Sequence, residues 1–142
     1  MRIDDASLTE GNFFMDVQLR PRRSVLYMPA ANARALEKAK TIAADALIFD
    51  LEDAVAPDAK DLARQQAAAA AASGEYGNRE ITIRCNGLDT PWGEADIAAA
   101  AQAAPSAIVI PKVIGVSHLG QIASAMEASG AASHTTIWAM VE

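Results

Sequence analysis

The stretch ALIFDLEDAVAP, residues 46–57, decides the predicted fold. Its first residues form a short apolar run that ends in Asp50, and two more acids, Glu52 and Asp53, follow almost at once. An apolar run without polar residues at alternate positions is typical of a strand buried on both faces, as in parallel sheets built from β-α-β units. We therefore predict a buried strand at 46–50 whose carboxyl end presents acidic groups.

Runs of the same kind recur on both sides of this strand. They predict four further strands, at residues 24–28, 80–85, 107–110 and 135–141. The segments between them have helical spacing and helix signals. Those signals are a capping Asn32, an Ala-rich helix from Asp58 to about Gly74, a helix after Pro91 to about residue 103, and a helix capped by Ser117 and ended by Gly130.

This alternation predicts an α/β fold of the (β/α)8 TIM-barrel type, of which the chain supplies the first five strands and four helices. An open doubly wound sheet is the alternative, but the first strand is followed by Pro-Ala-Ala-Asn and not by a glycine-rich phosphate loop. We place the partial barrel at residues 23–142 and an N-terminal arm at residues 1–22. Five strands cannot close a barrel, so we expect a fragment of a longer polypeptide, or else a half-barrel that pairs with a partner.

The composition of the chain argues against several classes of function. The net charge of −6 argues against nucleic-acid binding, which depends on basic residues, and no apolar run approaches the roughly 20 residues that span a bilayer. The acidic first 19 residues do not resemble a secretion signal. The single cysteine, Cys85, cannot form an internal disulfide. We expect a cytoplasmic protein that binds neither nucleic acid nor membrane.

Charged residues follow the predicted strands from the second onward, at the end where barrel active sites lie. Glu52 and Asp53 follow the second strand, Arg84 and Lys112 the third and fourth, and Glu142 the fifth. A guanidinium matches a carboxylate, so Arg84 is the natural substrate anchor. Carboxylates suit Mg²⁺, with Glu142 as candidate ligand. A metal beside a carbonyl or enolate stabilises the charge that develops when a carbon–carbon bond breaks or forms.

Each of these residues also has a purely structural interpretation. The acids at 50–53 could begin a helix, Arg84 could be their salt-bridge partner, and Lys112 could be a solvated loop residue. Their joint occurrence at one end of the sheet favours function. A nucleophilic Cys85 is disfavoured because no base can be placed beside it, and the two histidines lack metal-ligand spacing.

On these residues the chain resembles the citrate lyase beta subunit-like branch of the HpcH/HpaI aldolase superfamily, and within it the malyl-CoA and β-methylmalyl-CoA lyases. The matching stretches cover nearly everything from Arg23 onward. They are RSVLYMP (23–29), ALEKA (35–39), ALIFDLEDAVAP (46–57), Lys60, Ala63-Arg64, IRCNG (83–87), DTPW (89–92), VIPK (109–112) and Val141-Glu142.

The resemblance implies a Mg²⁺-dependent carbon–carbon lyase that cleaves a 3-hydroxyacyl-CoA thioester, of malyl-CoA, β-methylmalyl-CoA or citramalyl/citryl-CoA type, into an acyl-CoA and a 2-oxo acid. It implies that Glu142 binds the metal and that Arg84 binds the substrate carboxylate. Glu52 and Asp53 would hold Arg84 or metal-bound water. Arg23, and more weakly Lys38, would reach substrate or CoA phosphates. A homo-oligomer, trimer or hexamer, is also implied.

The family's second metal ligand follows a sixth strand, so we expect the 142 residues alone to be inactive. Two other functions stay open: a CoA-independent class II pyruvate aldolase, and a non-catalytic truncated half-barrel. The basic cluster of Arg20, Arg22 and Arg23 favours an anionic CoA substrate over the aldolase. The sequence does not identify the acyl group or the oxo acid.

Overall fold

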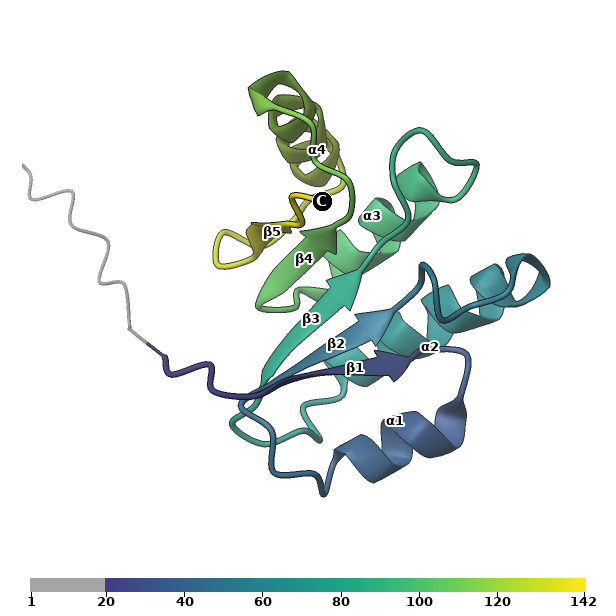
Figure 1. The fold of residues 1–142 in the computed structure, drawn as a ribbon, viewed down its shortest axis with the longest axis vertical. Coiled ribbons are helices and arrows are strands. Elements are labelled where there is room, and N and C mark those ends of the chain that lie inside the picture. The colour runs from purple at the N-terminus through teal and green to yellow at the C-terminus, as the bar shows by residue number, and fades with distance from the viewer. Residues whose placement is uncertain (1–19) are drawn as a thin grey trace, which may run out of the picture.

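The computed structural model describes residues 20–142, which form one parallel sheet with the strand order β1-β2-β3-β4-β5 (Figure 1). The strands are β1 (Val25–Pro29), β2 (Ala46–Asp50), β3 (Glu80–Arg84), β4 (Ala107–Ile110) and β5 (Thr136–Ala139). Between them lie α1 (Ala33–Ala39), the short 3-10 helix η1 (Pro57–Ala59), α2 (Lys60–Ala72), α3 (Gly93–Ala103) and α4 (Val116–Ala128). The predicted arm at residues 1–22 falls almost wholly outside the described residues.

The hydrophobic core lies between the sheet and its helices. Each crossover connection places the next strand on the same side of the preceding strand. Right-handed crossovers that all run in one direction put every helix on the same face of the sheet. Phe49, Ile83 and Ile108 from the strands are fully buried there, together with Ile97 and Ile122 from the helices. The opposite face of the sheet is therefore free to present polar side chains.

The sheet is curled, so that its two edge strands approach each other across the face without helices. The Tyr27 hydroxyl of β1 lies 3.8 Å from the sulfur of Met140, just after β5. At the other end of the strands, the Arg22 guanidinium lies 5.1 Å from the centre of the Trp138 ring in β5. An open doubly wound sheet would hold its edges apart. The curvature is that of part of a barrel.

The burial of the strands departs from the prediction at the edges. Strands β2 and β4 are buried along their whole length, as expected for central strands. In β1, by contrast, Val25, Leu26 and Tyr27 are 41%, 36% and 44% exposed. In β5, none of the four residues is buried. The prediction that every strand is buried on both faces is therefore wrong for β1 and β5, because an edge strand has a neighbour on one side only.

Helix boundaries agree with the sequence signals except at the starts of α2 and α4. The predicted start at Asp58 lies in η1, and α2 begins at Lys60. The Asn32 side chain accepts a hydrogen bond from Ala35 N and so caps α1, and Gly130 follows α4 with a left-handed φ of 73°. Ser117 does not cap α4, because the helix already begins at Val116 and Gly115 occupies the cap position. Within the described part of the chain, no helix combines the length and the apolar character needed to cross a membrane.

Candidate active site at the carboxyl end of the sheet

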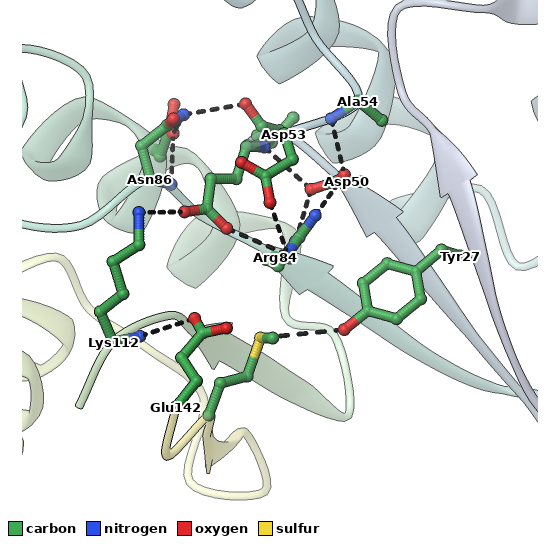
Figure 2. Close-up of polar contacts among 12 residues, drawn as sticks. Tyr27, Asp50, Asp53, Ala54, Arg84, Asn86, Lys112 and Glu142 are labelled. Carbon is green, nitrogen blue, oxygen red and sulfur yellow. Dashed lines mark hydrogen bonds and ion pairs between the residues drawn. The ribbon is translucent and has the colours of Figure 1, made fainter.

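A buried ion pair between β2 and β3 forms the centre of the site. Asp50 and Arg84 are register partners in the parallel ladder, so their side chains lie next to each other. Arg84 Nε and Nη2 donate to Asp50 Oδ1 and Oδ2, each over 2.7 Å (Figure 2). The two side chains are only 9% and 1% exposed. This fork geometry fixes the guanidinium plane relative to the sheet.

The surroundings of the pair keep both groups charged. The hydrogen bond to Asp50 raises the pKa of Arg84 above its usual value. Burial opposes ionisation of Asp50, but hydrogen bonds from Arg84 and from the backbone N–H groups of Glu52 and Ala54 outweigh it and lower the pKa of this carboxyl. The Tyr27 ring lies 4.9 Å from the guanidinium carbon and offers it a cation–π contact.

The second edge of the Arg84 guanidinium is less firmly occupied. Nη1 lies 3.0 Å from Glu52 Oε2 and 3.7 Å from Asp53 Oδ2, and the Asp53 side chain is 78% exposed. This edge borders an open hollow of about 520 Å³ lined by Tyr27, Asp50, Asp53, Ala54 and Arg84. If the exposed Asp53 turns away, a carboxylate entering the hollow can take its place on Arg84.

Lys112 connects the acidic loop after β2 to Glu142, three residues after the end of β5. Its backbone N–H donates to Glu142 Oε1 over 3.2 Å, and its Nζ donates to Glu52 Oε1 over 3.3 Å (Figure 2). Glu52 raises the pKa of Lys112 through this contact. Lys112 has a left-handed φ of 52°, a conformation that costs energy for a residue other than glycine. The loop after β4 is thus bent at the point where it meets Glu142.

The structure brings four of the residues predicted from sequence to one end of the sheet. Glu52, Asp53, Arg84 and Glu142 come from the ends of β2, β3 and β5, and Glu52 bridges Arg84 to Lys112, which also contacts Glu142. Successive parallel strands place their carboxyl ends on one rim, as the prediction required.

Two predicted residues do not join this group. Arg23 precedes β1, at the amino end of the strands, where it pairs with Asp45 over 2.8 Å. Lys38 lies exposed in the last turn of α1, which returns from the rim to that same amino end. Neither side chain is placed beside Arg84, so we leave both out of the site.

Sequence reasoning missed three residues that the site uses. The sequence pattern groups Asp50 with the acids of its loop, yet Asp50 is the principal partner of Arg84. Tyr27 lies below the guanidinium, and Lys60 is buried behind the acidic loop. Lys60 had a usable signal, because a lysine in the first turn of a helix opposes the helix dipole and calls for a separate explanation.

Cys85 is not a nucleophile in this fold. Its side chain is completely buried on the helix-covered face, and burial raises its pKa well above the usual value. Catalysis by a thiol needs the thiolate in an accessible position. The structure therefore agrees with the sequence argument against Cys85.

Glu142 fits one position in a magnesium shell. The carboxylate is exposed, and the described residues donate a hydrogen bond to Oε1 but none to Oε2. The described residues contain no group of three potential side-chain ligands. Mg²⁺ keeps several waters and is commonly held by one or two carboxylates. Glu142 can therefore serve as one ligand, with the others coming from water, substrate or residues outside the described part.

The chain belongs to the HpcH/HpaI aldolase/citrate lyase family, because the family model of that description matches residues 23–142. The (3S)-malyl-CoA thioesterase of Cereibacter sphaeroides is 46% identical over 125 residues, which are 88% of this chain and 42% of that protein. The citrate lyase subunit beta of Escherichia coli K12 is 40% identical over 66% of this chain and 31% of its own length. These findings confirm the family resemblance.

Solved structures agree on the fold. Protein CitE from Mycobacterium tuberculosis, in complex with magnesium, acetoacetate and coenzyme A, is 25% identical with a TM-score of 0.64, over 87% of this chain and 41% of that one. The malate synthase of Haloferax volcanii has a TM-score of 0.70 at 20% identity, over 84% of this chain and 41% of that one. The predicted partial TIM-barrel fold is confirmed. The chain spans about two fifths of the length of the thioesterase it matches.

Proposed function

We propose that this chain carries the substrate-anchoring half of a Mg²⁺-dependent lyase that splits a 3-hydroxyacyl-CoA thioester into an acyl-CoA and a small 2-oxo acid. The observation that carries the proposal is the rim itself. Arg84 is fixed by Asp50 along one edge and borders an open hollow along the other, and Lys112 links its acidic partner Glu52 to Glu142.

The residues have separate tasks in this reaction. The carboxylate beside the 3-hydroxyl of the substrate takes the place of Asp53 on the Nη1 edge of Arg84, which orients the bond between C2 and C3. Glu142 is one of the ligands that hold the metal. The metal, when bound, stabilises the negative charge that develops on the substrate oxygens as this bond breaks. Asp50 and Glu52 keep Arg84 in place, because a misplaced anchor loses most of the benefit of orientation.

The protons balance without any further reactant. The 3-hydroxyl proton leaves as the bond between C2 and C3 breaks, C3 becomes the carbonyl carbon of the 2-oxo acid, and a proton is added to C2 to give the acyl-CoA. Both substrate and product are anions. The second Arg84 edge therefore suits the carboxylate in the substrate and in the released oxo acid alike.

A second candidate is hydrolysis of the thioester. The relative that is 46% identical is named a (3S)-malyl-CoA thioesterase, whereas the relative named L-malyl-CoA/beta-methylmalyl-CoA lyase is 38% identical over 66% of this chain. Hydrolysis uses the same anchored carboxylate, but water attacks the thioester carbonyl and the products are the free acid and CoA thiol. A CoA-independent aldolase is less favoured, because these relatives are named for CoA thioesters.

The test uses the protein expressed from its full reading frame, with (3S)-malyl-CoA as substrate. The 2-oxo acid is trapped as its phenylhydrazone, and free thiol is measured separately with a disulfide reagent. We expect oxo acid to form in Mg²⁺ and not in excess chelator. Thiol without oxo acid would favour the thioesterase, and neither product would overturn the proposal.

Glu142→Gln is the variant that tests the metal ligand. The amide keeps the size of the side chain but removes its charge, so we expect kcat/KM to fall at least about a hundred-fold. Glu127→Gln is the matched control, because Glu127 is an exposed acid on α4. It should leave the kinetics unchanged. Full activity in Glu142→Gln would contradict the assignment.

A further inference from the structure

Lys60 is a buried lysine that directs all of its ammonium protons to the rim. It is the first residue of α2 and only 6% exposed. Its Nζ donates to Leu51 O and Glu52 O over 2.7 Å each and to Asn86 Oδ1 over 2.9 Å. An ammonium group has three N–H donors, so each of them has a partner.

The three acceptors belong to the segments that carry the site. Leu51 and Glu52 are the residues directly after β2, and Asn86 comes two residues after Arg84. Asn86 in turn donates from Nδ2 to Leu51 O over 2.9 Å and to Asp96 Oδ2 over 2.6 Å. Lys60 therefore ties the end of β2 to the end of β3 from behind.

Apart from these hydrogen bonds, the position of Lys60 is energetically unfavourable. A cation in the first turn of a helix opposes the helix dipole, and removing an ammonium from water is costly. Its hydrogen-bond acceptors are neutral carbonyl oxygens and not carboxylates. Burial lowers the pKa of Lys60, against the attraction of Asp96 and Asp50. The contacts to the loop, to Asn86 and to the Trp92 ring, whose centre lies 5.2 Å from Nζ, offset this cost.

We infer that Lys60 is a positioning residue of the active site, which fixes the backbone at Leu51 and Glu52 and thereby aims the Glu52 carboxylate at Arg84 and Lys112. Glu52 is the link between those two cations, at 3.0 Å from Arg84 Nη1 and 3.3 Å from Lys112 Nζ. A neutral side chain at position 60 takes one donor from each of the three acceptors. Leu51 O and Glu52 O keep a second donor, from Asn86 Nδ2 and Val55 N, whereas Asn86 Oδ1 has no other donor among the described residues. The loop is then held less firmly. This inference rests on the proposed function only where it predicts an effect of Lys60 on the kinetics.

The kinetic test compares Lys60→Met, Glu52→Gln and the double variant in the protein from the full reading frame. Methionine keeps the apolar stem, so we expect kcat to fall about 10- to 100-fold, as for other residues that orient ligands, with a smaller change in KM. If Lys60 acts through Glu52, the double variant is no slower than the slower single variant. Effects that multiply would overturn the inference.

The matched control is Lys40→Met. Lys40 follows α1 and pairs with Glu37 and Glu75, each over 2.6 Å, at the opposite end of the sheet from the rim. Its loss removes two ion pairs without touching the acidic loop. We expect kcat and KM to stay at the wild-type values in this variant.

A second readout does not depend on activity. The amides of Glu52 and Ala54 donate to the Asp50 carboxylate over 2.9 and 3.1 Å. In Lys60→Met, hydrogen exchange of the segment 51–54 should accelerate at least about ten-fold, while the central strands keep their wild-type protection. A purely structural role would speed exchange throughout the sheet.

The outcomes separate the two proposals. A wild type that cleaves no thioester overturns the proposed function, and the exchange experiment still decides the role of Lys60. An active wild type with unchanged kcat and exchange in Lys60→Met overturns the role of Lys60 alone. If Lys60→Met does not fold, Lys60→Arg replaces it, because the planar guanidinium keeps the charge but cannot direct donors to all three acceptors. Wild-type kcat in Lys60→Arg would then contradict the inference.

Discussion

The two ends of the sheet both carry arginine–carboxylate pairs, yet they differ in how completely these are satisfied. At the amino end, Arg22 donates two hydrogen bonds to Glu80, of 2.6 and 2.8 Å, and stacks on Trp138. At the carboxyl rim, Arg84 forms the same fork with Asp50 and still has further carboxylates beside it.

The difference lies in the balance of charge. At the amino end, Glu80 pairs with Arg22 and Asp45 pairs with Arg23, so each of these two acids has an arginine of its own. At the rim, Asp53 is largely exposed and Glu142 has an oxygen that no described residue occupies. The carboxylates in excess at the rim can bind a cation, and the fixed guanidinium of Arg84 can bind an anion. This is the arrangement that the proposed reaction needs.

The largest expected effect is on folding, from Arg84→Met. The variant leaves the Asp50 carboxylate, which is 1% exposed, buried without its ionic partner. Breaking a buried pair in this way costs about 3 to 5 kcal/mol of unfolding free energy. Urea denaturation at pH 7 measures it. A loss below about 1 kcal/mol would mean that the rim pair resembles an ordinary surface salt bridge.

The next effect is the pH dependence that Asp50 contributes. Its pKa is lower in the folded protein than the value of about 3.9 for a free side chain. The stability it adds is therefore present above about pH 4 and is lost as the pH falls through the folded pKa. In urea denaturation from about pH 7 down to about pH 2, which includes this titration, Asp50→Asn should have a shallower acid slope than wild type. Identical slopes would show that Asp50 does not titrate in this way.

The smallest effect is expected from Arg23→Met at the amino end. The Arg23 side chain is 79% exposed, and surface ion pairs contribute little because solvent already screens them. Its position before β1 also keeps it away from the rim. We expect no resolvable change in the unfolding midpoint and an unchanged KM for malyl-CoA. A raised KM would show that Arg23 reaches the substrate after all.

The sequence predicted the strands well where burial is uniform. The bounds of β2 and β4 are those predicted, because both are short, wholly apolar runs between turn residues. It erred at the edge strands β1 and β5, whose apolar side chains are partly exposed, because an apolar run looks the same in an edge strand and in a central one. Which strand lies at an edge depends on the whole sheet.

The rim could be predicted from strand direction, but its internal pairing could not. Arg84 ends β3 and Glu142 follows β5, so they share an end of the sheet, and the same rule applied to Arg23, which precedes β1, places it at the opposite end. The choice of Asp50 over Glu52 as principal partner of Arg84 depends on the register of β2 against β3. That register is set by packing across the sheet and not by the local sequence.

Anomalous diffraction from Mn²⁺ in crystals of the protein from the full reading frame tests the central claim most directly. Mn²⁺ accepts the same oxygen ligands as Mg²⁺ and can be located by its anomalous signal. We expect one strong peak bound to the Glu142 carboxylate, on the rim that holds Arg84. A strong peak at the amino end of the strands, or none on the rim in crystals saturated with Mn²⁺, would contradict it.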